Sequence, residues 1–305
     1  KNMEYLLLPL GCALASLKVT LQSKFSKSGK HTLSQNVFFT AIMFAVISLM
    51  LLPTLFNGGI TATTVFYAAL LGSFSLLYQI LYVIALSMGR MTLTVIINSF
   101  SMLIPMLVSI FFLGDEFTPL IGVGAALALA SLCLTVVNKS KRGEERRNGG
   151  ENMVWLILTL LVFLTNGLAS VSQKLYTTNI NMDLPPLERL DIVGEFICIA
   201  YLIAAVEAFV IFAVLAPKDK VKGIKLVSKR TVVIGCGVGA ALGVFQCVNT
   251  FGISLIPGSI YYPTYNCGTS IVLAFIGAIL FKERFTVRQY IGIGIGVIAI
   301  LLLCI

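Results

Sequence analysis

The sequence predicts an all-α membrane protein of ten transmembrane helices, arranged as two inverted five-helix repeats. Apolar residues make up 58% of the 305 residues and charged residues only 11%, against ~25% in an average soluble domain. The mean hydropathy is +0.96. The apolar residues also form ten separate runs, each long enough to cross ~30 Å of hydrocarbon. The lipid bilayer is therefore the expected surrounding of most of the chain.

Charges, prolines and glycines separate the apolar runs. The predicted spans are residues 3–22, 35–56, 62–87, 91–113, 119–138, 153–174, 192–216, 231–255, 259–281 and 287–305. Only Gly89 and Arg90 divide the third span from the fourth. The first run follows a single lysine and lacks a small-residue cleavage site, so we expect a retained span rather than a signal peptide.

The polar segment 139–152, which reads KSKRGEERRNGGEN, divides the chain into two halves of five spans, 1–138 and 153–305. Five is an odd number, so two similar halves would cross the membrane in opposite orientations. Residue pairs repeat between the halves: Gly11 with Gly167, Lys18 with Lys174, Gln79 with Gln246, Asn98 with Asn266, Ser101 with Thr269, and Asp115–Thr118 with Glu283–Thr286. The last four pairs are offset by 167 or 168 positions, which predicts an inverted repeat.

Short motifs occur in the same order in both halves. They are Ala85-Leu86, Pro105, Leu113–Thr118 and Gly122/Gly124 in the first half, and Glu283, Phe285-Thr286, Gln289 and Gly292/Gly294/Gly296 in the second. In this arrangement the chain resembles the EamA-like family of the drug/metabolite transporter superfamily. The resemblance implies a ten-helix transporter of small polar metabolites or drugs. Members move amino acids, nucleobases, sugars, cations or drugs, so the resemblance does not identify the substrate.

Uncharged polar side chains inside the spans are candidates for a substrate site. They are Gln79, Tyr82, Asn98, Gln246, Asn249, Tyr265 and Asn266. Amides inside hydrocarbon need polar partners, and aromatic walls with a few amides are typical of small-molecule pockets. The alternative is a purely structural role in hydrogen bonds between helices.

Charged side chains inside the spans are the other candidates. Lys174 and its counterpart Lys18 could hold an anionic group, or could extend their ammonium groups to the nearby interface. Glu207 lies in the middle of an apolar run, where it could carry a coupling proton, bind a cationic substrate, or form a structural ion pair with Lys174. Glu195, near the start of the same run, is expected at the interface.

These patterns favour a secondary transporter over an enzyme. The sequence has no G-x-x-x-x-G-K-[ST], no H-E-x-x-H, no G-x-S-x-G and no C-x-x-C, so we expect no catalytic residues, metal or cofactor. Transport by alternating access would involve a small-molecule metabolite and a coupling proton or ion, or exchange, in a monomer or homodimer. An intramembrane enzyme and a structural or adaptor protein are the alternatives.

Basic residues predict the orientation in the cell membrane. Eighteen Lys and Arg follow odd-numbered spans, and only Lys1 and Arg189 lie on the other side. The positive-inside rule therefore places the basic loops in the cytoplasm and both ends outside. The net charge of +9 lies in these short loops, which argues against nucleic-acid binding.

Overall fold

The computed structural model describes residues 7–26, 32–56, 59–87, 94, 97–136, 149–180, 184–221, 227–281 and 286–304. Over these residues the chain forms ten α-helices and no strand, which confirms the all-α prediction. The helices are α1 (Leu7–Ser26), α2 (Leu33–Leu51), α3 (Ala62–Ser87), α5 (Leu103–Phe112), α6 (Pro119–Val136), α7 (Gly149–Thr177), α8 (Pro186–Val221), α9 (Lys229–Leu255), α10 (Gly258–Phe281) and α11 (Val287–Cys304). Two 3₁₀ turns, η2 (Leu52–Phe56) and η3 (Phe100–Met102), complete the described helical structure.

Five segments are long and apolar enough to cross a membrane: Leu33–Phe56, Ala62–Ala85, Met153–Thr177, Glu188–Pro217 and Lys229–Leu255. Shorter apolar segments occur at Leu7–Lys18, Ile97–Phe112, Pro119–Leu134 and Val287–Leu303. The chain is therefore an integral membrane protein. The crossings predicted for the remaining helices stay predictions.

The predicted span 91–113 is helical where the structure describes it. Residues 94 and 97–99 are α-helical, the η3 turn follows, and α5 begins at Leu103. Pro105 accounts for the 3₁₀ turn before α5, because it has no N–H for the carbonyl of Ser101 and its ring would collide with that carbonyl in a regular α-helix. Proline is tolerated in the first turn of a new helix, which is where Pro105 lies.

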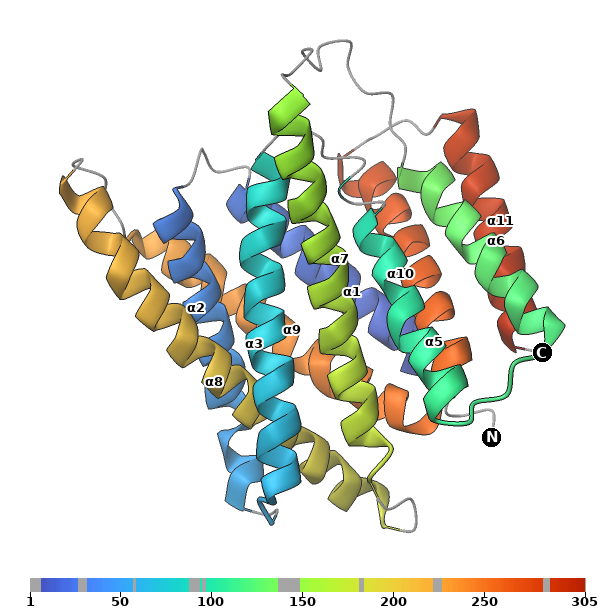
Figure 1. Ribbon diagram of the computed structural model, residues 1–305, viewed down its shortest axis with the longest axis horizontal. Coiled ribbons are helices and arrows are strands. Elements are labelled where there is room, and N and C mark those ends of the chain that lie inside the picture. Colours follow the sequence, from blue (N-terminus) through green and yellow to red (C-terminus); the bar gives the residue numbers. More distant parts are fainter. Residues whose placement is uncertain are drawn as a thin grey trace.

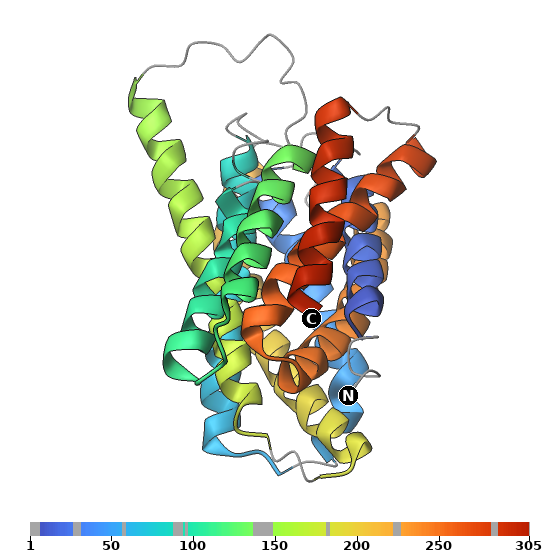
Figure 2. The same cartoon turned by 90° about the vertical axis from the view of Figure 1, so that its right-hand side faces the viewer.

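Successive helices run in alternating directions through one bundle (Figure 1). Helices α2 and α8 lie side by side at one edge, and α6 and α11 at the other, as the view in Figure 2 also shows for α6 and α11. Helices from the two halves alternate across the bundle, since α3 packs on α7 and α1 packs on α9 and α10. The halves are therefore intertwined rather than separate lobes.

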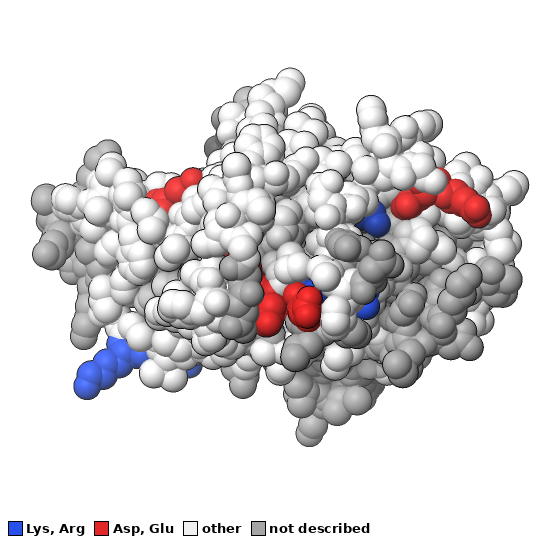
Figure 3. All heavy atoms as spheres, turned by 90° about the horizontal axis from the view of Figure 1, so that it is seen from below, with Lys and Arg blue, Asp and Glu red and all other residues white. Residues whose placement is uncertain are grey.

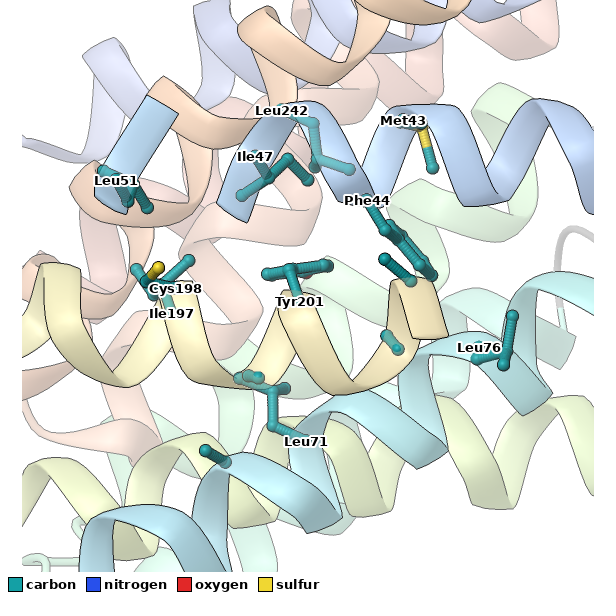
Figure 4. Packing of buried hydrophobic residues seen from close by; sticks show 14 of the residues in the cluster. Met43, Phe44, Ile47, Leu51, Leu71, Leu76, Ile197, Cys198, Tyr201 and Leu242 are labelled. Carbon is teal, nitrogen blue, oxygen red and sulfur yellow. The ribbon is translucent and has the colours of Figure 1, made fainter. Parts of the chain in front are cut away.

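The largest core cluster lies between α2, α3, α8 and α9 (Figure 4). Tyr201 of α8 packs on Phe44 of α2 with ring centroids 5.0 Å apart. Gly72 allows α3 to approach α8, because a Cβ at this position would collide with the Ala200 carbonyl. This contact places the polar residues of α3 close to α8.

The outward faces of the helices are apolar, with exposed side chains such as Val210 on α8 and Leu301 on α11. Exposed apolar surface of this extent suits contact with lipid tails. The lower end of the bundle shows only a few acidic and basic groups separated by uncharged surface (Figure 3).

Candidate functional site

One group of polar side chains joins the two halves of the chain. Asn166 of α7 donates from Nδ2 to Oδ1 of Asn98 at 3.1 Å and to Oγ of Ser101 at 2.7 Å. Asn98 donates to the Tyr78 hydroxyl at 3.5 Å, and Tyr78 stacks on Tyr82 with ring centroids 5.5 Å apart. These five residues, here named the Asn98 cluster, bring the predicted Asn98 and Tyr82 together.

A second group, named the Asn249 cluster, consists of Gln173 of α7, Asn249 and Thr250 of α9, and Tyr261 of α10. The Tyr261 hydroxyl donates to Oδ1 of Asn249 at 2.8 Å, and Asn249 donates from Nδ2 to Oε1 of Gln173 at 3.4 Å. The Gln173 amide also bonds to the Thr250 hydroxyl. All four side chains are buried, so these hydrogen bonds replace those that water would supply.

One face of α7 connects the two clusters. Asn166, Ser170 and Gln173 follow one another at spacings of four and three residues, which places them on the same side of the helix. Between the clusters, the Tyr262 hydroxyl of α10 donates to the Ser170 carbonyl at 3.1 Å. At 1.5 Å per residue, Asn166 and Gln173 lie about 10 Å apart along the axis.

Aromatic rings of α9 and α10 form a stack beside the Asn249 cluster. Tyr261 and Tyr265 are 5.9 Å apart between ring centroids and nearly parallel, at 7°. Phe245 lies on Tyr265 at 5.9 Å and 24°. The predicted Asn266, in contrast, donates to the Tyr262 carbonyl of its own helix at 3.0 Å.

The predicted glutamines occupy different surroundings. Gln79 is buried within α3. Gln246 bonds through its amide to the Tyr201 hydroxyl on α8, and the other end of this amide is buried without a hydrogen-bond partner in the described part of the chain. An unsatisfied buried amide is costly, which makes this end of Gln246 a position where a bound molecule would gain a hydrogen bond.

Lys174 of α7 is buried against the C-terminal end of α9. Its Nζ donates to the Ile253 carbonyl at 3.2 Å and the Ile256 carbonyl at 3.4 Å, and the side chain is 5% exposed. The Ile253 carbonyl lacks its usual donor, because Pro257, four residues later, has no N–H. Lys174 therefore supplies both hydrogen bonds and positive charge where the helix dipole is negative.

Asp115 holds the other side of the same turn. Its Oδ2 accepts from the backbone N–H of Gly258 at 2.6 Å and of Ser259 at 3.3 Å, at the N-terminus of α10. A carboxylate at this position satisfies free N–H groups and complements the positive end of the helix dipole. Asp115 and Lys174 thus bracket Ile256 and Pro257, the turn between α9 and α10, and we call this arrangement the turn clamp.

Glu207 is not the partner of Lys174. The half-buried Glu207 of α8 accepts a hydrogen bond from the Ser73 hydroxyl of α3 at 2.7 Å, so the two predicted charged residues lie apart with different partners. Glu195, near the start of the same run, is 2% exposed and so lies inside the bundle. Lys18 is half-buried on α1.

Asn166 and Gln173 are the site residues that the sequence prediction missed. Their positions in the first half correspond to Leu10 and Leu17, so the repeat gave no sign of them. The spacing of Asn166, Ser170 and Gln173 along one helix face was the available signal.

Comparisons with known proteins show what the first half of the chain and the overall fold are similar to. Residues 4–137 match the model of the EamA-like transporter family. A solved crystal structure of another protein aligns over 99% of this chain and 96% of its own, with a TM-score of 0.74 and 14% identity, which shows the shared fold alone. No curated protein matches the chain. Residues 4–137 are thus similar to the EamA-like transporter family, which belongs to the drug/metabolite transporter superfamily.

Proposed function

We propose that the chain is a secondary transporter that carries a small polar molecule across the cell membrane by alternating access. The moving parts are the two five-helix halves, 1–138 and 153–305, acting as inverted repeats, and the basic loops face the cytoplasm. The substrate lies between the Asn98 and Asn249 clusters, with Gln79, Tyr265 and Asn266 nearby. Glu207 carries the coupling proton, at the contact between α3 of one half and α8 of the other.

The packing of the helices supports the inverted repeat. In the proposed repeat, α1, α2 and α3 correspond to α7, α8 and α9. The contact of α3 with α7 then corresponds to the contact of α9 with α1, and both contacts exist. The contact of α3 with α8 likewise becomes that of α9 with α2, which also exists. The pairs α2 with α8, α5 with α10, and α6 with α11 become themselves, as pairs on a two-fold axis would.

The single observation that carries the transport proposal is the hydrogen bonding of Asn166 to Asn98 and Ser101. These uncharged polar groups come from different halves and meet within an otherwise apolar membrane protein. A contact between halves that is made from hydrogen bonds can exchange its partners for a solute when the halves move. Apolar side chains alone could not replace the hydrogen bonds that a polar solute loses when it leaves water.

The turn clamp holds one end of the helix bundle closed in this proposal. Asp115 follows α5 in the first half, whereas Lys174 and the α9–α10 turn belong to the second. Opening this end requires the two halves to separate, which breaks the hydrogen bonds from Gly258 and Ser259 to Asp115. The repeat predicts an equivalent arrangement of Lys18 and Glu283 at the opposite end, and Glu283 lies outside the described residues.

Solute flux in proteoliposomes tests the proposal. Preloaded vesicles should exchange labelled solutes from a panel of nucleosides, amino acids, hexoses and quaternary amines, and Asn166→Leu should abolish the exchange of the accepted solute. Ser172→Ala is the matched control, because Ser172 is buried on the same helix and bonds only to its own backbone at the Leu168 carbonyl, 2.9 Å away. A folded parent protein that exchanges no member of the panel would favour the enzyme or adaptor alternatives.

A further inference from the structure

Given the transport function proposed above, we infer that the substrate is an uncharged, planar heterocycle with hydrogen-bonding edges, of the nucleobase or nucleoside type. Two properties of the site carry this inference. The hydrogen-bonding side chains of both clusters are neutral, and the aromatic rings beside them lie in parallel stacks.

The charged side chains near the site are engaged elsewhere. Lys174 binds the carbonyls at the end of α9, Asp115 binds the amides at the start of α10, and Glu207 binds Ser73. The clusters themselves contain only amides, hydroxyls and phenols. Within the two clusters, a carboxylate or ammonium group of a substrate would therefore meet no opposite charge, which costs far more than a neutral group would.

Lys18 adds a further restriction. It lies seven residues after Gly11, and therefore on the same face of α1, about 10 Å along the axis. Gly11 faces the ring of Tyr265, with 4.0 Å between that ring and the position of a Cβ. The positive charge of Lys18 disfavours a cationic solute stacked on Tyr265.

The rings offer flat surfaces to a flat solute. Tyr78 with Tyr82 and Phe245 with Tyr265 are stacked at 26° and 24°. Tyr78, Tyr82 and Tyr265 are only half-buried, so part of each ring is free to contact a bound molecule. Nucleobases stack on such rings with about 1–3 kcal/mol per base, which a puckered sugar ring or an aliphatic chain would not gain.

The amides suit the edge of a heterocycle. An Asn or Gln side chain presents a donor and an acceptor in one plane, which is the arrangement that pairs with the donor and acceptor atoms of a base such as adenine. Gln246 has one amide end buried without a partner in the described part of the chain. Asn249 lies three residues later on the same face of α9, beside Tyr261. Together these residues place amide edges next to ring faces.

Ligand stabilisation of the purified full chain in nanodiscs tests the class. Adenosine and uridine should raise the melting temperature in a concentration-dependent way. Adenosine 5′-monophosphate, phenylalanine and choline carry charged groups, and glucose has no planar ring. None of these four compounds should therefore raise the melting temperature. Stabilisation by any of these four without stabilisation by the nucleosides would overturn the inference, as would no stabilisation by any compound. Equal stabilisation by adenosine and its monophosphate would overturn the requirement for an uncharged molecule.

Two substitutions at Tyr265 keep the test independent of folding. Tyr265→Phe retains the ring and should bind adenosine as the parent does, whereas Tyr265→Leu should weaken the apparent affinity by about 10- to 100-fold. Equal affinity of both variants would refute stacking at this position. Nucleoside binding without exchange in proteoliposomes would leave the ligand class standing and refute transport. Exchange of a charged solute without nucleoside binding would support transport and refute the proposed ligand class.

Discussion

Replacing Asp115 with alanine should open the end of the bundle that the turn clamp closes. The carboxylate accepts hydrogen bonds of 2.6 Å from Gly258 and 3.3 Å from Ser259, and both donors are free N–H groups at the first turn of α10. Asp115 belongs to the opposite half of the chain. Its loss therefore weakens the contact between halves while leaving the interior of α10 intact.

The size of the effect follows from these two contacts. Loss of a helix N-cap side chain costs about 1 kcal/mol, and the interaction of a partly buried charge with a helix end contributes up to about 2 kcal/mol. Water that reaches the opened end recovers part of this, so about 2 kcal/mol is a reasonable net value. Since 1.4 kcal/mol is a factor of ten, the ratio of closed to open protein should fall about 30-fold.

Labelling of a buried reporter measures this ratio. Ser109 of α5 is fully buried against Gly258, so Ser109→Cys should react with an impermeant thiol reagent only when this end opens. The seven native cysteines would first be replaced by alanine or serine. Asp115→Ala should accelerate labelling about 30-fold. Glu116→Gln, which removes an exposed charge from the same loop, should leave the rate unchanged. Equal labelling rates in the parent and Asp115→Ala would refute the clamp.

The remaining predictions concern the charged residues. Lys174→Met leaves two buried carbonyls without donors and should lower the free energy of unfolding by about 2 kcal/mol, measured by thermal or denaturant unfolding, whereas Lys18→Met should change it much less. Glu207→Gln is nearly isosteric and keeps an acceptor for Ser73, so the variant should melt like the parent yet fail to concentrate its solute; retained uphill transport would remove Glu207 from the mechanism. Ser228→Cys should be protected from an impermeant reagent in intact cells, and labelling there would reverse the predicted orientation.

Hydrophobic runs predicted the helices well because lipid imposes a minimum length and excludes charge. The predicted span 62–87 coincides with α3, and the predicted span 259–281 differs from α10 by one residue at its start. Hydrophobicity does not predict where a helix continues beyond its apolar part. Helix α8, for example, runs from Pro186 to Val221, beyond both ends of the predicted span 192–216.

The site was predicted in part for a related reason. The sequence identified Asn98, through the repeat, and Asn249, as an amide inside a span, and both are bonded to other side chains of the interior. Their partners Asn166 and Gln173 come from α7, which carries polar residues where α1 carries leucines. A search for symmetric positions cannot find residues that are present in one half only. The partner of Lys174 was equally hidden, because it is a backbone carbonyl 79 residues away.

In the described interior, the charged residues and the amides have different backbone surroundings. Lys174 and Asp115 lie at helix ends, where unpaired carbonyls and N–H groups compensate a buried charge. The amides of the two clusters lie within helices, where the backbone groups already bond to one another, so only neutral side chains are inexpensive there. Glu207 is different, because it lies in the middle of α8 with a serine hydroxyl as its bonded partner. No described helix end lies beside it, and Ser73, its hydrogen-bond donor, comes from the other half of the chain. This position is why we assign proton coupling to Glu207 rather than to the residues of the turn clamp.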